Sequence, residues 1–374
     1  MSKVKFINRY NLRVARENMG FNARQVSKSL TTSEKDIVSI WESGDGFPTW
    51  SQIKSLAKKY NISELAFFSS KNIQENKIIP DFRIGIKEKE TDDVKKLINL
   101  VLKRQKWLED VLKSEKYPQN KLIGSGGGIR SPLVLATFVL KSLGINLEEI
   151  KAISGFSSKR KTLSYLIDKA ENKGIFVGKT ISYHRIEVEK MRGLFVASDY
   201  APFIVLNRAD ALSAQIFSLI HELAHFFRKS ESISNSIDFR DSNKNVNDEE
   251  RFCNRVAAEL LLPKDELRED FYDKNDIERI AELYKMSNIF VFYRLKDLGK
   301  IKAGQGNLES QILKETEENL SNWKKNRGKG GNYYNNMRDS NGNLFNKIVT
   351  KSYLQNRIGY VEASHLLKFS VEKI

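Results

Sequence analysis

Several residue types that mark whole classes of protein are scarce in this chain. It has one cysteine in 374 residues, which excludes a disulfide within the chain and is typical of a reducing compartment. It has no apolar run of about 20 residues, the length that crosses a bilayer, and residues 1–10 are charged and lack the apolar core of a signal peptide. We therefore expect a cytoplasmic protein without a membrane partner.

Acidic residues are outnumbered by basic ones. The chain has 63 Lys and Arg against 47 Asp and Glu, a formal net charge of +16. Such a surplus favours an acidic or polyanionic partner and says nothing about the fold. The alternative explanation is a general compositional bias of the source, because Lys, Asn and Ile are all frequent.

Histidine is also rare, yet two of the four histidines lie within one helical turn. Residues 216–227 read IFSLIHELAHFF, an apolar run that predicts a buried helix. His221 and His225 are four residues apart, so they share a helix face and can bind one metal ion. The alternative is a helix that happens to carry two histidines. It is disfavoured because buried ionisable groups are costly unless paired or metal-bound.

Glu222 directly follows the first of these histidines. In an H-E-x-x-H helix this position can polarise a metal-bound water and then carry its proton. A zinc-bound water has a pKa of about 7, so a hydroxide nucleophile is available for amide hydrolysis at neutral pH. The expected cofactor is Zn²⁺, with Mn²⁺ as the alternative, because histidine and carboxylate ligands do not select zinc strictly.

A catalytic zinc site usually has three protein ligands, and no third histidine follows nearby. A carboxylate is the natural substitute. Residues 247–263 predict a second helix, which Pro263 prevents from extending. Glu249 and Glu250 both lie in its first turn, where carboxylates are also favoured without any metal. Spacing alone leaves the choice between them open.

H-E-L-A-H at 221–225 and E-R-F-C-N-R-V-A-A-E-L-L-L-P at 250–263 together resemble the ImmA/IrrE family of zinc metallopeptidases. The second motif of that family runs roughly E-x-x-A-N-x-F-A-A-x-L-L-x-P. The resemblance implies that Glu250 is the third metal ligand and Glu222 the catalytic acid, with Glu249 the runner-up ligand. Cys253 stands where the family usually has Ala, and Val256 where it has Phe.

Residues 1–70 predict a small helical module ahead of this site. The expected helices are 12–19, 23–30, 34–42, 50–60 and a short one at 63–68, with the third capped within 31–33. W-E-S-G-D-G-F-P-T-W-S-Q-I-K-S-L-A-K-K-Y at 41–60 resembles the repressor-like (XRE-type) helix-turn-helix domains of phage and bacterial regulators.

The net charge of this module favours nucleic-acid binding but does not establish it. Eleven Lys and Arg face six Asp and Glu in residues 1–70, a net charge of +5 that suits phosphate contacts. Glu34 and Asp36 oppose them, so the alternative is recognition of another repressor by protein contact. The candidate DNA-contacting residues are Arg24, Gln25, Lys28, Ser33, Lys35 and Ser39.

The expected fold class is α+β and mostly helical. A helix-turn-helix domain (1–70) precedes a helical connector (71–129), a zincin-like peptidase domain (130–300) with a small β-sheet, and a helical C-terminal region (301–374). The glycine-rich stretch 124–128 is expected to be a hinge or linker. The main expected elements are helices at 92–116, 133–143, 161–172, 277–285, 289–298, 344–356 and 360–369, and strands at 174–177, 193–196 and 203–207.

The family resemblance implies a zinc endopeptidase and transcriptional regulator that cleaves a partner repressor and so derepresses genes. One alternative is a non-proteolytic DNA-binding regulator whose metal site is structural or senses a ligand. An intact Glu222 argues against it, because a structural site needs no base. The other alternative is an antitoxin-like protein in which protein contact matters more than hydrolysis. A homodimer is an open option for the assembly.

Overall fold

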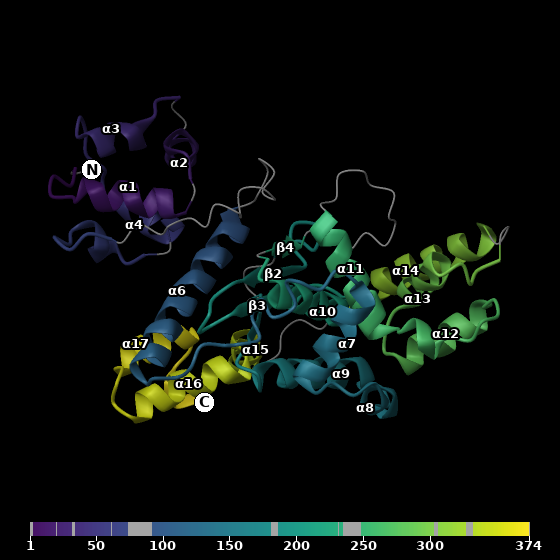
Figure 1. Cartoon of the computed structure of the whole chain (residues 1–374). Helices are drawn as coiled ribbons and strands as arrows, with labels where there is room; N and C mark the ends of the chain where they lie inside the picture. Colours follow the sequence, from purple (N-terminus) through teal and green to yellow (C-terminus); the bar gives the residue numbers. More distant parts are fainter. Residues whose placement is uncertain are drawn as a thin grey trace. The chain divides into compact units, whose positions relative to one another are not determined.

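The computed structural model in Figure 1 describes residues 3–19, 21–31, 34–60, 62–73, 92–180, 186–230, 232–234, 248–302, 306–326 and 332–373. Contacts within the chain separate two units, Met1–Lys103 and Arg104–Ile374, with the boundary inside one long helix. The predicted domain limits near residues 70, 129 and 300 stay a prediction.

The N-terminal unit begins with short helices that enclose their own core. They are α1 (Arg9–Asn18), α2 (Ala23–Leu30), α3 (Ile37–Ser43), α4 (Trp50–Tyr60) and the 3₁₀ turn η1 (Glu64–Phe67). The predicted bounds of the second and fourth helices are confirmed. The core side chains include Leu12, Phe21, Val26, Val38, Trp41, Ile53, Leu56, Tyr60 and Phe67.

Capping side chains explain where the other bounds differ. Asn8 caps α1, so this helix starts at Arg9, earlier than predicted. The side chain of Asp36 accepts the backbone N–H of Ser39, so α3 starts at Ile37. The predicted start of the third helix at residue 34 was therefore wrong, because Asp36 caps the helix two residues later.

The larger unit continues from α6 (Asp92–Ser114), which crosses the boundary. Of the helices that follow, α8, α14 and α15 were not predicted. The helices are α7 (Pro132–Leu143), α8 (Leu147–Ala152), α9 (Ser158–Glu171), α10 (Leu212–Arg228), α11 (Asp248–Leu261), α12 (Lys274–Leu283), α13 (Asn288–Asp297), α14 (Gly306–Asn326), α15 (Tyr333–Asn341), α16 (Asn343–Leu354) and α17 (Tyr360–Leu367). Short 3₁₀ turns lie at Lys264–Glu266 and Val371–Lys373.

A small sheet lies among these helices. Its strands are β1 (Phe176–Lys179), β2 (Gly193–Val196), β3 (Phe203–Leu206) and β4 (Ser232–Ser234), in the order β1-β3-β2-β4. β1 runs parallel to β3, and the other pairs are antiparallel. The three predicted strands are present, with β1 two residues later than expected. β4 was missed because a three-residue strand carries too little sequence pattern.

The central helix of the larger unit is α10. It packs against β2 and β3 on the sheet and against α7, α9 and α11, and Figure 1 shows it among these elements. Every residue from Ile216 to Phe227 is buried. Because neighbouring elements cover α10 on several faces, its sequence is apolar on all of them and does not show a single apolar face.

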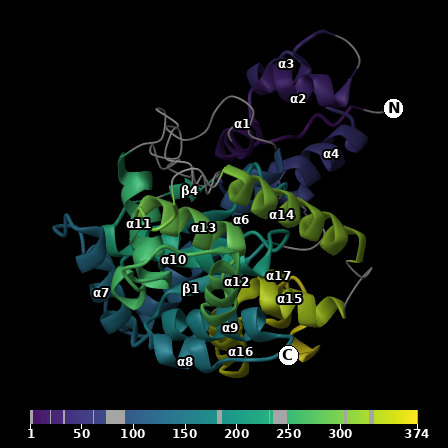
Figure 2. The same cartoon turned by 90° about the vertical axis from the view of Figure 1, so that its right-hand side faces the viewer.

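The C-terminal helices form a group of their own beside β1. α15, α16 and α17 contact one another, and α15 and α16 contact β1. Figures 1 and 2 both show the three helices together. The buried Arg104 side chain donates to Asn341 Oδ1 at 2.6 Å and to the Leu366 carbonyl at 3.0 Å. The buried Glu171 carboxylate accepts the backbone N–H of Leu344 at 3.2 Å. These two buried side chains tie the C-terminal helices to α6 and α9.

The glycine-rich stretch 124–128 is not a hinge, which corrects the expectation. Gly124 N–H donates to the Phe226 carbonyl at 3.0 Å, and Gly126 N–H donates to the Phe227 carbonyl at 2.7 Å. A Cβ on Gly126 would lie 2.6 Å from a methyl carbon of Leu135. The stretch is a packed turn that satisfies carbonyls at the C-terminal end of α10, and glycine is needed for the close approach.

The predicted fold class, α+β with helical ends, is confirmed. Among the described residues, no helix has the length and apolar character required to cross a membrane.

Candidate metal centre

α10 carries three ionisable side chains into the interior. His221 is 3% exposed, Glu222 is fully buried and His225 is 1% exposed. The ring of His221 stacks on Phe217, one turn earlier in the helix. Because His221 and His225 are one helical turn apart, their imidazoles converge, with a distance of 3.1 Å between the two Nε2 atoms.

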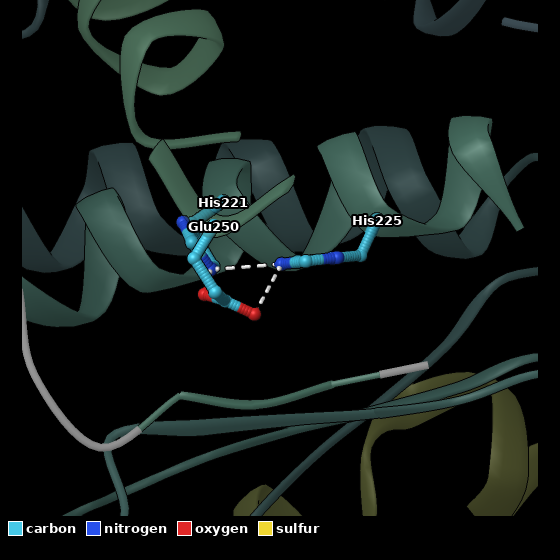
Figure 3. A group of neighbouring side chains, drawn as sticks. All are labelled: His221, His225 and Glu250. Carbon is cyan, nitrogen blue, oxygen red and sulfur yellow. Dashed lines mark hydrogen bonds and ion pairs between the residues drawn. The ribbon is translucent and has the colours of Figure 1, made fainter. Parts of the chain in front are cut away.

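α11 brings a carboxylate to the same point. It packs against α10 and α7, and its buried positions there include the small Cys253 and Ala257. Glu250, in its first turn, places Oε2 3.1 Å from His221 Nε2 and Oε1 3.3 Å from His225 Nε2. Figure 3 shows the three side chains pointing toward one another.

The spacing of these donor atoms fits a metal ion. A tetrahedral zinc ion with ligands at about 2.0–2.1 Å has its donor atoms about 3.3 Å apart. The separations of 3.1, 3.1 and 3.3 Å between the two Nε2 atoms and the Glu250 oxygens lie close to that value. Two imidazole nitrogens and one carboxylate are also a chemically suitable donor set. His221, His225 and Glu250 are therefore a candidate site for one divalent ion.

The charges of the cluster reinforce one another. Burial acts to raise the pKa of Glu250, but hydrogen bonds and charge from His221 and His225 outweigh it and hold that pKa well below its usual range. Burial acts to lower the pKa of His221, but the Glu250 hydrogen bond and the charges of Glu222 and Glu250 raise it overall. The cluster is thus arranged to keep Glu250 ionised, which is the form that ligates metal.

Glu249 points away from this cluster and holds a neighbouring group. It pairs with Arg228, whose Nη2 lies 2.9 Å from Oε2, and it accepts a hydrogen bond from Ser230 Oγ at 3.1 Å. Burial acts to raise the pKa of Glu249, but Arg228 lowers it overall. Ser230 Oγ also lies 2.9 Å from His225 Nδ1. The runner-up ligand of the sequence analysis therefore lies behind His225.

Glu249 and Cys253 also form a second group with His225 that has metal-ligand spacing. The thiol of Cys253 is buried, and burial together with Glu249 and Glu250 raises its pKa well above the usual value. Thiols bind metal as thiolates, and Glu249 is already engaged by Arg228. This second group is a poorer metal site than the first.

The carboxylate of Glu222 packs against the start of β2. A Cβ built on Gly193 would lie 2.3 Å from Glu222 Oε1 and 3.0 Å from its Cδ and Cγ. Real Cβ atoms do not approach other atoms so closely, so only glycine leaves room for Glu222 in this position. Gly193 was predicted as a strand residue, and no sequence signal linked it to the site.

Asn254 is a further neighbour that the sequence did not single out for a role. It lies one turn after Glu250 on α11, and its side chain contributes to raising the pKa of His221. His221 Nδ1 and Asn254 Oδ1 are both buried, and neither makes a hydrogen bond of good geometry. The sequence shows that Asn254 matches the Asn of the family motif, but it does not show that Asn254 lies beside His221.

The candidate DNA-contacting residues lie on a different unit from the metal centre. Arg24, Gln25 and Lys28 are exposed on α2, and Ser39 is exposed on α3, where its hydroxyl donates to Asp36. Lys35 is exposed just before α3. Ser33 lies outside the described residues. DNA binding by these residues stays a prediction.

Residues 177–296 match a family model, Peptidase_M78, described as the IrrE N-terminal-like domain. This stretch runs from β1 to α13 and contains the whole candidate metal centre. The match supports the resemblance to the ImmA/IrrE family and indicates a metallopeptidase-type function for this part of the chain. Comparison with curated proteins and with solved structures gave no match.

Proposed function

We propose that this chain is a zinc-dependent endopeptidase that cleaves a partner protein. The observation that carries the proposal is the convergence of His221, His225 and Glu250 beside the buried Glu222, within the stretch that matches the peptidase family. A structural metal site does not require the carboxylate of Glu222, whereas hydrolysis of an amide requires a group that moves protons.

The residues divide the work as follows. His221, His225 and Glu250 hold the zinc ion, which when bound acts as a Lewis acid and lowers the pKa of water. Glu222 takes a proton from the attacking water and delivers it to the leaving amine, as general base and then general acid. The packing of Glu222 against Gly193 fixes the carboxylate, so orientation is set before substrate arrives.

The sheet offers a way to bind an extended peptide. β4 forms one end of the strand order and pairs with β2, in which Gly193 contacts Glu222. A peptide that adds to this edge gains main-chain hydrogen bonds and lies two strand spacings, about 10 Å, from β2 and its contact with Glu222. This arrangement favours a protein or peptide substrate over a small molecule.

The N-terminal unit supports a regulatory setting. Its helices α2 and α3 and its net positive charge suit a helix-turn-helix module that binds DNA or another repressor. We propose that the substrate is a repressor of this kind and that cleavage derepresses genes. The rival is a regulator that binds metal and DNA without cutting, and the antitoxin-like alternative relies on protein contact alone.

The test compares the wild-type protein with Glu222→Gln, which keeps the shape of the side chain and removes the base. Each is produced together with a candidate repressor, and zinc content, repressor integrity and new protein N-termini in the whole lysate are measured. Equal zinc in both proteins, with new N-termini only for the wild type, supports the peptidase. Bound zinc with no wild-type-specific N-terminus contradicts it and favours the non-proteolytic regulator.

A further inference from the structure

We propose that Ser230 and Glu249 form a positioning relay that fixes the tautomer and orientation of His225 for metal binding. The inference rests on the proposed function of the metal centre and deepens it. It gives Glu249, which the sequence left as a rival ligand, a separate role.

The geometry assigns the two ring nitrogens of His225 to different tasks. Nε2 faces the cluster, 3.1 Å from His221 Nε2 and 3.3 Å from Glu250 Oε1. Nδ1 faces the opposite way and lies 2.9 Å from Ser230 Oγ. A histidine ligand must present a lone pair to the metal, so the proton of the neutral ring has to be on Nδ1.

The hydroxyl of Ser230 selects the Nδ1–H tautomer of His225 because its own proton is donated to Glu249. Ser230 Oγ lies 3.1 Å from Glu249 Oε1. A carboxylate paired with arginine can only accept a hydrogen bond, so Ser230 donates to Glu249. Its lone pairs then accept from His225 Nδ1–H, and Nε2 is left free to bind metal.

Glu249 is itself held in place. Arg228 contacts both of its carboxylate oxygens. The Arg228 guanidinium in turn donates to the Ile129 carbonyl at 3.1 Å and lies 4.4 Å from the ring centre of Phe252. Arg228 of α10 therefore holds Glu249 in place through contacts with α11 and with the turn before α7.

Ser230 lies just after Lys229, the residue that caps the end of α10, and this local backbone also positions it. Lys229 adopts a left-handed conformation with φ of 56°, and the backbone N–H of Ser230 donates to the His225 carbonyl at 3.0 Å. The helix end thus turns the Ser230 hydroxyl back toward His225, one turn earlier. Groups that orient a metal-binding histidine in this way are worth about 10- to 100-fold in metal affinity.

The test measures zinc dissociation constants by competition with a fluorescent chelator at fixed pH. Ser230→Ala and Glu249→Gln are each expected to weaken zinc binding by about 10- to 100-fold. Ser230→Thr keeps the hydroxyl and is expected to stay close to the wild type. Ser114→Ala and Glu278→Gln are matched controls at exposed positions on α6 and α12 and should leave zinc affinity unchanged.

A second readout separates positioning from general damage to the fold. Nitrogen NMR of the zinc-bound protein should show a hydrogen-bonded His225 Nδ1–H in the wild type and a shifted Nδ1 resonance in Ser230→Ala, while far-UV circular dichroism stays the same. Unchanged zinc affinity in Ser230→Ala, or an unshifted His225 Nδ1 resonance in that zinc-bound variant, would refute the relay alone. Failure of the wild type to bind zinc would refute the metal centre itself, and the proposed function with it.

Discussion

The contact between Gly193 and Glu222 leads to a sharp test of the catalytic carboxylate. The change is Gly193→Ala, which adds one methyl group at the start of β2. The new Cβ would lie 2.3 Å from Glu222 Oε1 and 3.0 Å from Cδ and Cγ. Ordinary contacts to carbon are about 3.5 Å or longer, so the carboxylate has to move by about 1 Å.

A displacement of this size is expected to impair proton transfer more than binding. Misplacing a catalytic group by about 1 Å can cost about 100-fold in rate. We therefore expect kcat to fall about 100-fold, with KM and zinc affinity close to wild type, because Gly193 is not in the metal cluster. Gly128→Ala is the matched control, since a Cβ there would have no neighbour within 4 Å.

The assay uses a quenched fluorescent peptide that spans the cleavage site identified from the new N-termini. Zinc content and thermal unfolding are measured on the same preparations. Wild-type kcat in Gly193→Ala, with zinc bound, would show that the position of the Glu222 carboxylate does not limit the reaction. Loss of zinc in this variant would show instead that the methyl group disturbs the ligands, and the reasoning on Glu222 would be wrong.

Three further predictions concern stability. Burial raises the pKa of Glu171 from 4.5 to about 7, so the native state holds a proton that the unfolded chain loses, and stability should fall as pH rises from about 4.5 to 7, by at most about 3 kcal/mol. Glu171→Gln should remove that slope, which urea unfolding at several pH values can measure, and a slope equal to that of wild type would contradict it. Arg104→Met should cost about 2–4 kcal/mol, because Asn341 Oδ1 and the Leu366 carbonyl lose a buried donor; denaturant midpoints test this, and a change under about 0.5 kcal/mol would refute it. Zinc at about 100 times its dissociation constant should add about 2.7 kcal/mol to the unfolding free energy of the wild type and none to His221→Ala, and calorimetry with and without zinc decides between them.

Local periodicity was enough to indicate the first half of the site. His221 and His225 share a helix face because four residues make about one turn, and the structure places their Nε2 atoms together. Periodicity could not decide between Glu249 and Glu250. Adjacent residues on a helix point about 100° apart, so which of them faces the histidines depends on how α11 is rotated against α10. The family resemblance implied Glu250, and the packing of α11 on α10 brings Glu250 into the cluster and turns Glu249 toward Arg228.

Where the sequence reasoning was wrong, a tertiary contact or a competing local group was responsible. The glycine-rich stretch 124–128 has the composition of a flexible linker, but its N–H groups bind the end of α10. The third helix was placed too early because Asp36 competes successfully as its cap. β4 forms by pairing with β2, and its three residues are too few to show an alternating apolar pattern.

The order of residues was enough to predict the α+β class, most of the helices, and a helix that carries His221, Glu222 and His225 close together. These depend on interactions within about one helical turn or on alternating burial, which the order of residues encodes directly. The packing of the folded chain shows which carboxylate meets the histidines, that Gly193 makes room for Glu222, and that Ser230 lies behind His225. Those contacts join segments separated in sequence, and they depend on how helices and strands pack, which no local pattern specifies.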